Sequence, residues 1–114
     1  MLIGEIHPGI IATAGKDSKP NVSAKGSFQV VDDDHVAFAD VSSPRSVANL
    51  MENPQISIIC LDTNRRSCRI WGTAEVLDSG PIFDKVTAPL AARNITANHV
   101  VSVQVDEVET NLPG

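Results

Sequence analysis

The strongest constraint on the fold is a two-residue alternation of side-chain polarity over residues 20–31. The even positions from Val22 to Val30 are apolar or small, whereas the odd positions from Asn21 to Gln29 are polar. Because successive side chains of a β-strand point to opposite faces, this pattern is typical of a strand with one apolar face. It predicts one long strand whose polar side chains point outward.

The rest of the chain predicts more strands, joined mostly in hairpins. Asp32–Asp34 interrupts the alternation, and residues 36–40 return as the second strand of a hairpin. Strands are also predicted at residues 9–14, 55–62, 67–77 and 99–108. One helix begins at Pro44 and stops at Asn53; a second begins near Ile82, and Pro89 should end or kink it. We therefore expect a mainly β fold: a split β-barrel of about six mostly antiparallel strands with two short helices, in one domain over residues 1–114.

Composition and charge exclude several classes of function. The chain has 114 residues and a net charge of −5, without the basic stripe of a nucleic-acid-binding protein. No stretch is long and apolar enough to span a bilayer, and the first residues lack the pattern of a signal peptide. We expect a cytoplasmic protein in which Cys60 and Cys68 are reduced, although a turn centred near Asn64 would place them opposite each other, within reach of a cross-strand disulfide.

The sequence does not predict a metal site. His7, His35 and His99 are far apart in sequence, and neither cysteine belongs to a Cys/His cluster. Asp32–Asp34 lacks the later ligands of a calcium-binding loop and is more typical of a solvated turn. No catalytic residue is identified.

The stretch SSPRSVANL, residues 42–50, combines hydroxyl groups and a guanidinium at a predicted helix start. Unpaired N–H groups and partial positive charge make such a start suitable for an anion, phosphate above all. Arg45 and the neighbouring serines could add donors to the same group. By itself, the stretch is more typical of an ordinary cap at Ser43 followed by a surface arginine.

Taken together, residues 10–77 resemble the FMN-binding split-barrel family related to pyridoxamine 5′-phosphate oxidase, most closely its small FMN-binding proteins. The resemblance depends on the strand of residues 20–31, on SSPRSVANLMENP and on RIWGTAEVL, and is weaker through SGPIFDKV and the last strand. It implies that FMN phosphate binds to the first turn of the helix and that the flavin ring lies along the earlier strand, with backbone contacts near the ribityl chain. The residues at the matching positions are Arg45, Ser46 and Asn49 for the phosphate, Ser23, Ala24, Lys25 and Ser27 for the ring, and Ala39, Asp40 and Ser42 for the ribityl chain.

The resemblance also implies a homodimer with FMN at the subunit interface, acting in electron transfer between an unidentified donor and acceptor. Lys25 stands where small relatives often have an aromatic residue against the ring. The chain lacks the C-terminal tryptophan and arginine segment that binds pyridoxal phosphate, so we do not expect a true pyridoxamine phosphate oxidase. The alternatives are an FMN-dependent reductase or oxidase of a small molecule, and a non-redox module that binds haem or a deazaflavin. Trp71 is assigned either to the subunit interface or to the core.

Overall fold

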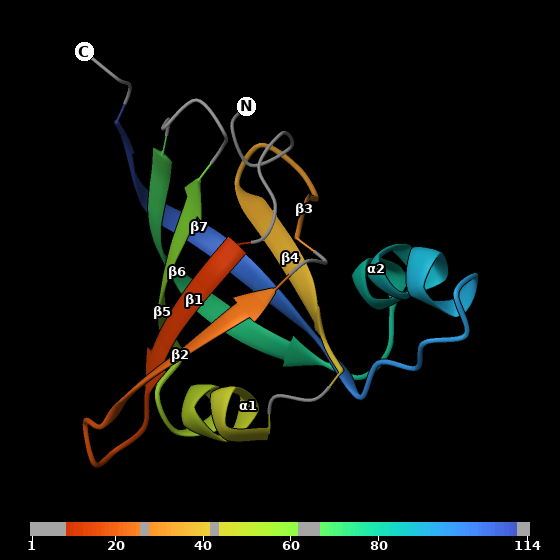
Figure 1. Cartoon of the computed structure of the whole chain (residues 1–114), viewed down its shortest axis with the longest axis horizontal. Coiled ribbons are helices and arrows are strands. Elements are labelled where there is room, and N and C mark those ends of the chain that lie inside the picture. The colour runs from red at the N-terminus through yellow and green to blue at the C-terminus, as the bar shows by residue number, and fades with distance from the viewer. Residues whose placement is uncertain (1–8, 26–27, 42–43, 62–66, 112–114) are drawn as a thin grey trace.

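The computed structural model describes residues 9–25, 28–41, 44–61 and 67–111, and this part of the chain forms seven strands and two helices. The mainly β architecture is confirmed, with one strand more than the sequence predicts. Figure 1 shows the elements, which follow in the order β1 (Gly9–Ala14), β2 (Pro20–Lys25), β3 (Gln29–Val30), β4 (His35–Asp40), α1 (Pro44–Glu52), β5 (Gln55–Leu61), β6 (Ser67–Leu77), α2 (Pro81–Ala91) and β7 (His99–Asn111).

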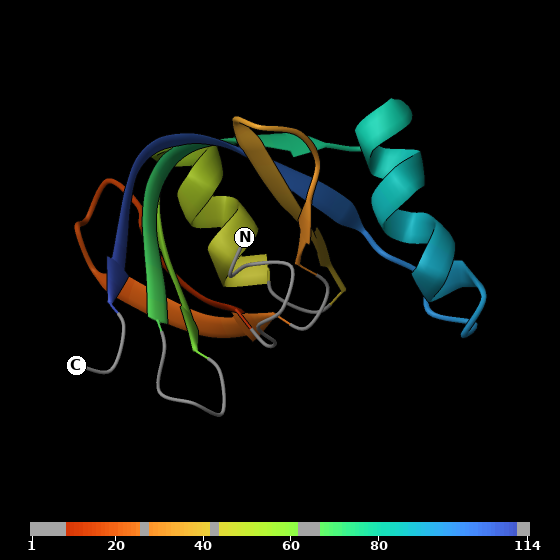
Figure 2. The same ribbon diagram turned by 90° about the horizontal axis from the view of Figure 1, so that it is seen from above.

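The strands form a single antiparallel sheet in the order β2-β1-β5-β6-β7-β4-β3. β2 and β3 are consecutive in the chain and yet lie at opposite edges of the sheet. The sheet must therefore curl until its edges approach each other, and Figure 2 shows this curvature from above. The result is the split barrel that the sequence predicts.

The long strand predicted over residues 20–31 is in fact two strands with different partners. β2 pairs with β1, whereas β3 pairs with β4 at the other edge. Only β3 and β4 form the predicted hairpin, and its Asp32–Asp34 turn is closed by a hydrogen bond of 2.8 Å from the Asp34 N–H to Asp32 Oδ1. The alternation continues across both strands because each has one interior face, so it does not reveal the change of partner.

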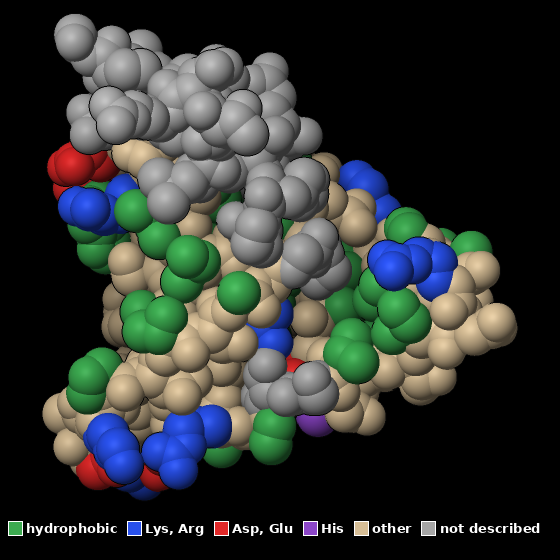
Figure 3. Space-filling view, viewed as in Figure 1, with side chains coloured by type: hydrophobic (Ala, Val, Ile, Leu, Met, Phe, Trp, Pro, Cys, Tyr) green, Lys and Arg blue, Asp and Glu red, His purple; other side chains and the backbone are tan. Residues whose placement is uncertain are grey.

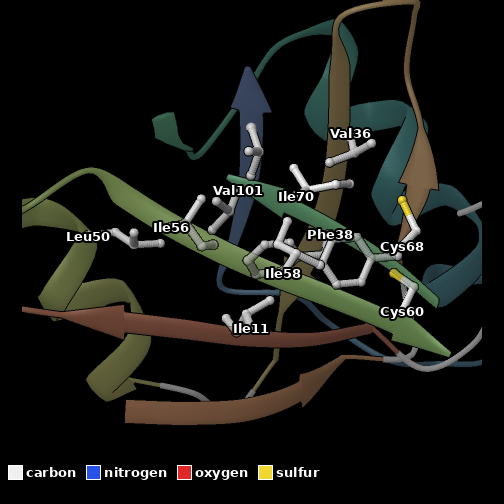
Figure 4. Packing of buried hydrophobic residues seen from close by; sticks show 12 residues of the cluster. Ile11, Val36, Phe38, Leu50, Ile56, Ile58, Cys60, Cys68, Ile70 and Val101 are labelled. Atoms are coloured by element: carbon white, nitrogen blue, oxygen red, sulfur yellow. The ribbon is translucent and has the colours of Figure 1, made fainter. Parts of the chain in front are cut away.

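The main core fills the inside of the curled sheet. Leu50 of α1 packs there against apolar side chains from the strands, and α1 lies within the curve (Figures 2 and 4). Phe28 and Phe38 stack in a tilted arrangement with ring centroids 4.9 Å apart. The buried members of this cluster are Ile11, Phe28, Val36, Phe38, Leu50, Ile56, Ile58, Cys60, Cys68, Ile70, Val101 and Val103.

Helix α2 covers the outer side of β4 and β7, where Val86 packs against Ala37, Ala39 and Val100. The sequence predicts that Pro89 ends or kinks this helix; the helix continues through Pro89 to Ala91, so Pro89 does not end it. Pro89 lies in the last turn, and the N–H of Ala92 still bonds to the Ala88 carbonyl. The missing proline N–H therefore removes little of the helix's hydrogen bonding.

Cys60 and Cys68 are direct partners in the β5–β6 register, as predicted, and both are buried free thiols. The turn predicted at residues 63–66 lies outside the described residues, as does the Ser43 cap. Within the described ranges, neither helix has the length and hydropathy needed to cross a membrane.

Candidate cofactor site

Helix α1 is held against β1 and β2 by hydrogen bonds between side chains. Asn21 donates through Nδ2 to the Ser46 Oγ at 3.1 Å, and Asn49 donates through Nδ2 to the Thr13 Oγ1 at the same distance. Ser46 is only 2% exposed. Together with Val47 and Leu50, which anchor the apolar side of the helix, these bonds fix the start of α1 against the inner side of the sheet.

Arg45 lies in the first turn of α1 and is exposed. It forms no ion pair with any described residue, and the first turn of the helix contains no acidic side chain. A guanidinium at the positive end of a helix is electrostatically unfavourable unless an anion is present. The start of α1 therefore has the charge and the donors to hold an anionic group.

The face of β2 that carries Asn21, Ser23 and Lys25 points into the barrel, which corrects the prediction that these polar residues point outward. Val22 on the other face is 66% exposed, whereas Lys25 is only 7% exposed. Alternation shows that the two faces differ in polarity, but not which of them is interior. Here the interior position is polar because it adjoins the start of α1.

Asp40 supplies negative charge near Lys25. Asp40 is 3% exposed, and its Oδ2 lies 3.4 Å from the His99 Nδ1. Burial lowers the pKa of Lys25, and the negative charge of Asp40 partly offsets this shift. Figure 3 shows basic and acidic side chains close together in a hollow near the centre of this view of the molecule. Lys25 and Asp40 form a buried charge pair inside the barrel.

The structure brings together some of the residues predicted for the site and separates others. Ser46 and Asn49 meet β1 and β2, while Lys25 and Asp40 interact inside the sheet. Ala24 is exposed on the outer face, and the side chain of Ala39 packs beneath α2. Ser23 is partly buried on the inner face, whereas Ser27 and Ser42 lie outside the described residues.

Three further residues belong to the same region: Thr13, Asn21 and His99. Asn21 belongs to the polar alternation and could have been included on that basis. Thr13 is a single hydroxyl in an apolar strand, and His99 meets Asp40 only because β7 pairs with β4. Both contacts join residues far apart in sequence, so no local pattern indicates them.

Comparisons with known proteins agree on the fold. The sequence profile of the family described as pyridoxamine 5′-phosphate oxidase matches residues 2–112. An uncharacterized protein of Methanocaldococcus jannaschii is 33% identical over 72 residues, which cover 61% of this chain and 48% of that protein, so the match spans about half of its length.

Two similar crystal structures share the architecture at low sequence identity. HupZ of Group A Streptococcus superposes with a TM-score of 0.86 at 23% identity, covering 99% of this chain and 90% of that one. An FMN-binding protein from Syntrophomonas wolfei superposes with a TM-score of 0.80 at 16% identity, covering 93% and 78% of the two chains. Identities this low show a common fold only.

Proposed function

The chain belongs to the pyridoxamine 5′-phosphate oxidase family, and from this premise we propose that it is an FMN-binding flavoprotein that acts in electron transfer. The observation that carries the proposal is Arg45, an exposed cation at the start of α1 with no ion-pair partner among the described residues. The description of one structural relative as FMN-binding supports the choice of cofactor.

The residues around the start of α1 fit a phosphate. Arg45 can donate two N–H groups to phosphate oxygens, and the first N–H groups of the helix point the same way. Ser46 accepts a hydrogen bond from Asn21, which leaves its own hydroxyl hydrogen available to donate. We assign the phosphate to Arg45 and Ser46, with Asn49 one turn further along α1.

The flavin ring is assigned to β2 and the residues after it: Ser23, Ala24, Lys25 and Ser27. The backbone of Ala39 and Asp40 lies next to the ribityl chain in this arrangement. FMN, when bound, supplies one- and two-electron redox chemistry, and the protein binds and orients it. The buried ammonium of Lys25 sets the electrostatic potential on the ring's side of the site, and Asp40 limits its effect.

We also propose that the protein is a homodimer that forms through the outer face of the sheet. Neither helix covers the outer face over β1, β2 and β5, since α1 lies inside the curve and α2 packs on the outer side of β4 and β7 (Figure 2). Figure 3 shows apolar side chains over the part of the surface where β1 and β2 lie. Strand register aligns two rows across it: Ala24, Ile10, Ile59 and Arg69, and Val22, Ala12, Ser57 and Trp71.

Trp71 supports this surface as an interface. It is partly exposed on the outer face and does not belong to either apolar cluster, so its assignment to the core is wrong. The Arg69 guanidinium lies over it at 5.9 Å from the ring centroid. Tryptophan and arginine are both enriched at protein interfaces. The free thiols of Cys60 and Cys68 suit a reducing compartment such as the cytoplasm.

The visible spectrum of the purified protein, followed by titration with FMN, tests the proposal. A bound flavin spectrum, or tight uptake that quenches FMN fluorescence, is the expected result. A colourless protein that takes up no FMN would overturn the cofactor assignment. Saturable oxidation of NAD(P)H with one small-molecule acceptor would instead identify an FMN-dependent reductase.

A further inference from the structure

A pocket lies on the outer side of the sheet, away from the start of α1. It has a volume of about 280 Å³ and is walled by β4, β6, β7 and Ile82 of α2. Its polar lining includes Asp32, His35, Glu75 and Ser102. No residue assigned to FMN contributes to it, so it needs an explanation of its own.

The charge of the pocket favours a cation. Asp32 and Glu75 line it, and none of the described lining residues is Lys or Arg. The N–H of Asp34 and the His35 ring both bond to the Asp32 carboxylate, and these bonds lower its pKa, so Asp32 is ionised at neutral pH. A third carboxylate, that of Asp106, lies next to the pocket. It accepts a hydrogen bond of 2.8 Å through Oδ2 from the hydroxyl of Thr73, which lines the pocket.

Ser102 is an independent sign of a ligand. It is only 7% exposed, lines the pocket, and its hydroxyl has no hydrogen-bond partner among the described residues. No fully buried side-chain oxygen or nitrogen of the described residues lacks a partner, so the Ser102 oxygen keeps some access to the pocket. A ligand in the pocket can therefore form a hydrogen bond with this hydroxyl.

The remaining groups define the ligand more closely. The Nδ1 of His35 lies 2.9 Å from Asp32 Oδ1, so a neutral ring that donates through Nδ1 presents Nε2 to the pocket as an acceptor. Gln104 also lines the pocket with a side-chain amide whose oxygen can accept a hydrogen bond, and Ile82 provides an apolar wall. No group of three or more potential metal ligands occurs among the described residues.

We propose that this pocket binds a small organic amine as its ammonium ion, with the ammonium held by Asp32 and Glu75, a hydrogen bond to Ser102, and an apolar body against Ile82. The volume is at the lower end for ligand pockets, which suits a small molecule. Charge and hydrogen-bond acceptors select the ammonium, and the single apolar wall limits the size of the body.

Titration of ¹⁵N-labelled protein with 2-phenylethylamine, followed by ¹H–¹⁵N NMR, tests the proposal. Saturable shifts are expected at the backbone amides of Thr73, Ala74, Ser102 and Gln104. The alcohol of the same shape, 2-phenylethanol, should bind about tenfold more weakly, because it lacks the charge that strengthens the hydrogen bonds. Equal binding of amine and alcohol, shifts spread over the acidic surface, or no saturable shift would each overturn the proposal.

Matched variants separate this pocket from general attraction to a chain of net charge −5. Glu75→Gln should weaken amine binding about two- to fivefold, the scale of one exposed ion pair. Glu107→Gln makes the same charge change on β7 outside the pocket and should leave the affinity unchanged. Ser102→Ala should weaken binding about threefold, the scale of one neutral hydrogen bond. Equal effects of Glu75→Gln and Glu107→Gln would show nonspecific attraction only, whether or not Ser102→Ala folds.

Discussion

At the scale of single residues, Arg45 differs from Arg69 in its surroundings. Arg69 has a carboxylate partner, Glu109, at 3.7 Å and an aromatic ring beneath it. Arg45 has neither, and it adds positive charge to the positive end of α1. The role proposed for Arg45 could be inferred from the sequence because arginine, serine and the helix start are adjacent in the chain.

Arg45→Ala is expected to weaken FMN binding by about 1–3 kcal/mol, since it removes charge-assisted hydrogen bonds to the phosphate. Fluorescence titration measures the change. Arg93→Ala is the control, because Arg93 is exposed in the segment after α2, and this variant should bind FMN normally. Unchanged affinity in Arg45→Ala, or equal binding of riboflavin and FMN, would show that the helix start does not hold the phosphate.

The buried thiols predict a dependence of stability on alkaline pH. Burial, with a smaller contribution from Cys68, raises the pKa of Cys60 from 9.0 to about 11. Above pH 9 the unfolded chain loses a proton that the folded protein keeps, so stability present below pH 9 is lost as the pH rises toward 11. The free energy of unfolding should fall by about 1–3 kcal/mol over this range. Urea unfolding at several pH values should show a smaller fall for Cys60→Ala; the same fall in both proteins would contradict the prediction.

At the scale of helices and strands, local pattern predicts most of the elements but not their partners. The predicted bounds of β1 and β6 equal the observed ones, since each is a regular strand between clear turns. The break between β2 and β3 was missed because it depends on which edge of the sheet each strand joins. The contacts of His99 with Asp40 and of Asn21 with Ser46 were missed for the same reason.

The bulge in β6 supplies a test at this scale. The β6–β7 register shifts between Trp71 and Gly72, and a Cβ on Gly72 would lie 2.5 Å from the Gln104 carbonyl oxygen. Because that oxygen belongs to the backbone, Gly72→Ala should destabilise the fold by about 1–3 kcal/mol in chemical denaturation. In Gly15→Ala the nearest atom belongs to the flexible Glu52 side chain, so the loss should be smaller. Equal losses would show that the approach of β7 is not what requires glycine.

For the whole molecule, the sequence indicated a barrel but assigned the wrong face of β2 to solvent. Val22 and Ala24 continue the rows of Ala12 and Ile10 on the outside of the sheet. Nothing in the described part of one chain covers these apolar side chains on the outer face. The alternation of apolar residues predicts that a face is buried, but it does not show whether the core of the same chain or a second subunit buries it. The proposed dimer gives this face a partner.

Val22→Lys should disrupt the dimer without unfolding the subunit. In a two-fold dimer each substitution occurs twice, and an unpaired charge in the contact should raise the dimer Kd by about tenfold or more. Sedimentation velocity measures the change, with circular dichroism to check the fold. Met51→Lys, at a residue of similar exposure on α1, is the control. A wild-type monomer that binds FMN tightly would contradict the proposed dimer.

The position of β7 between β6 and β4 has a consequence for how the chain folds during synthesis. Among the described strands, the β3–β4 hairpin joins the rest of the sheet only through the pairing of β4 with β7 (Figure 1). These two strands are separated in the sequence by about half the length of the chain. On the ribosome, the hairpin must therefore wait, with one edge unpaired, until residues 99–111 have emerged. Pairings between strands so distant in sequence form slowly, because a long loop must close first. Until then, the unpaired edge of β4 is open to pairing with strands of other chains.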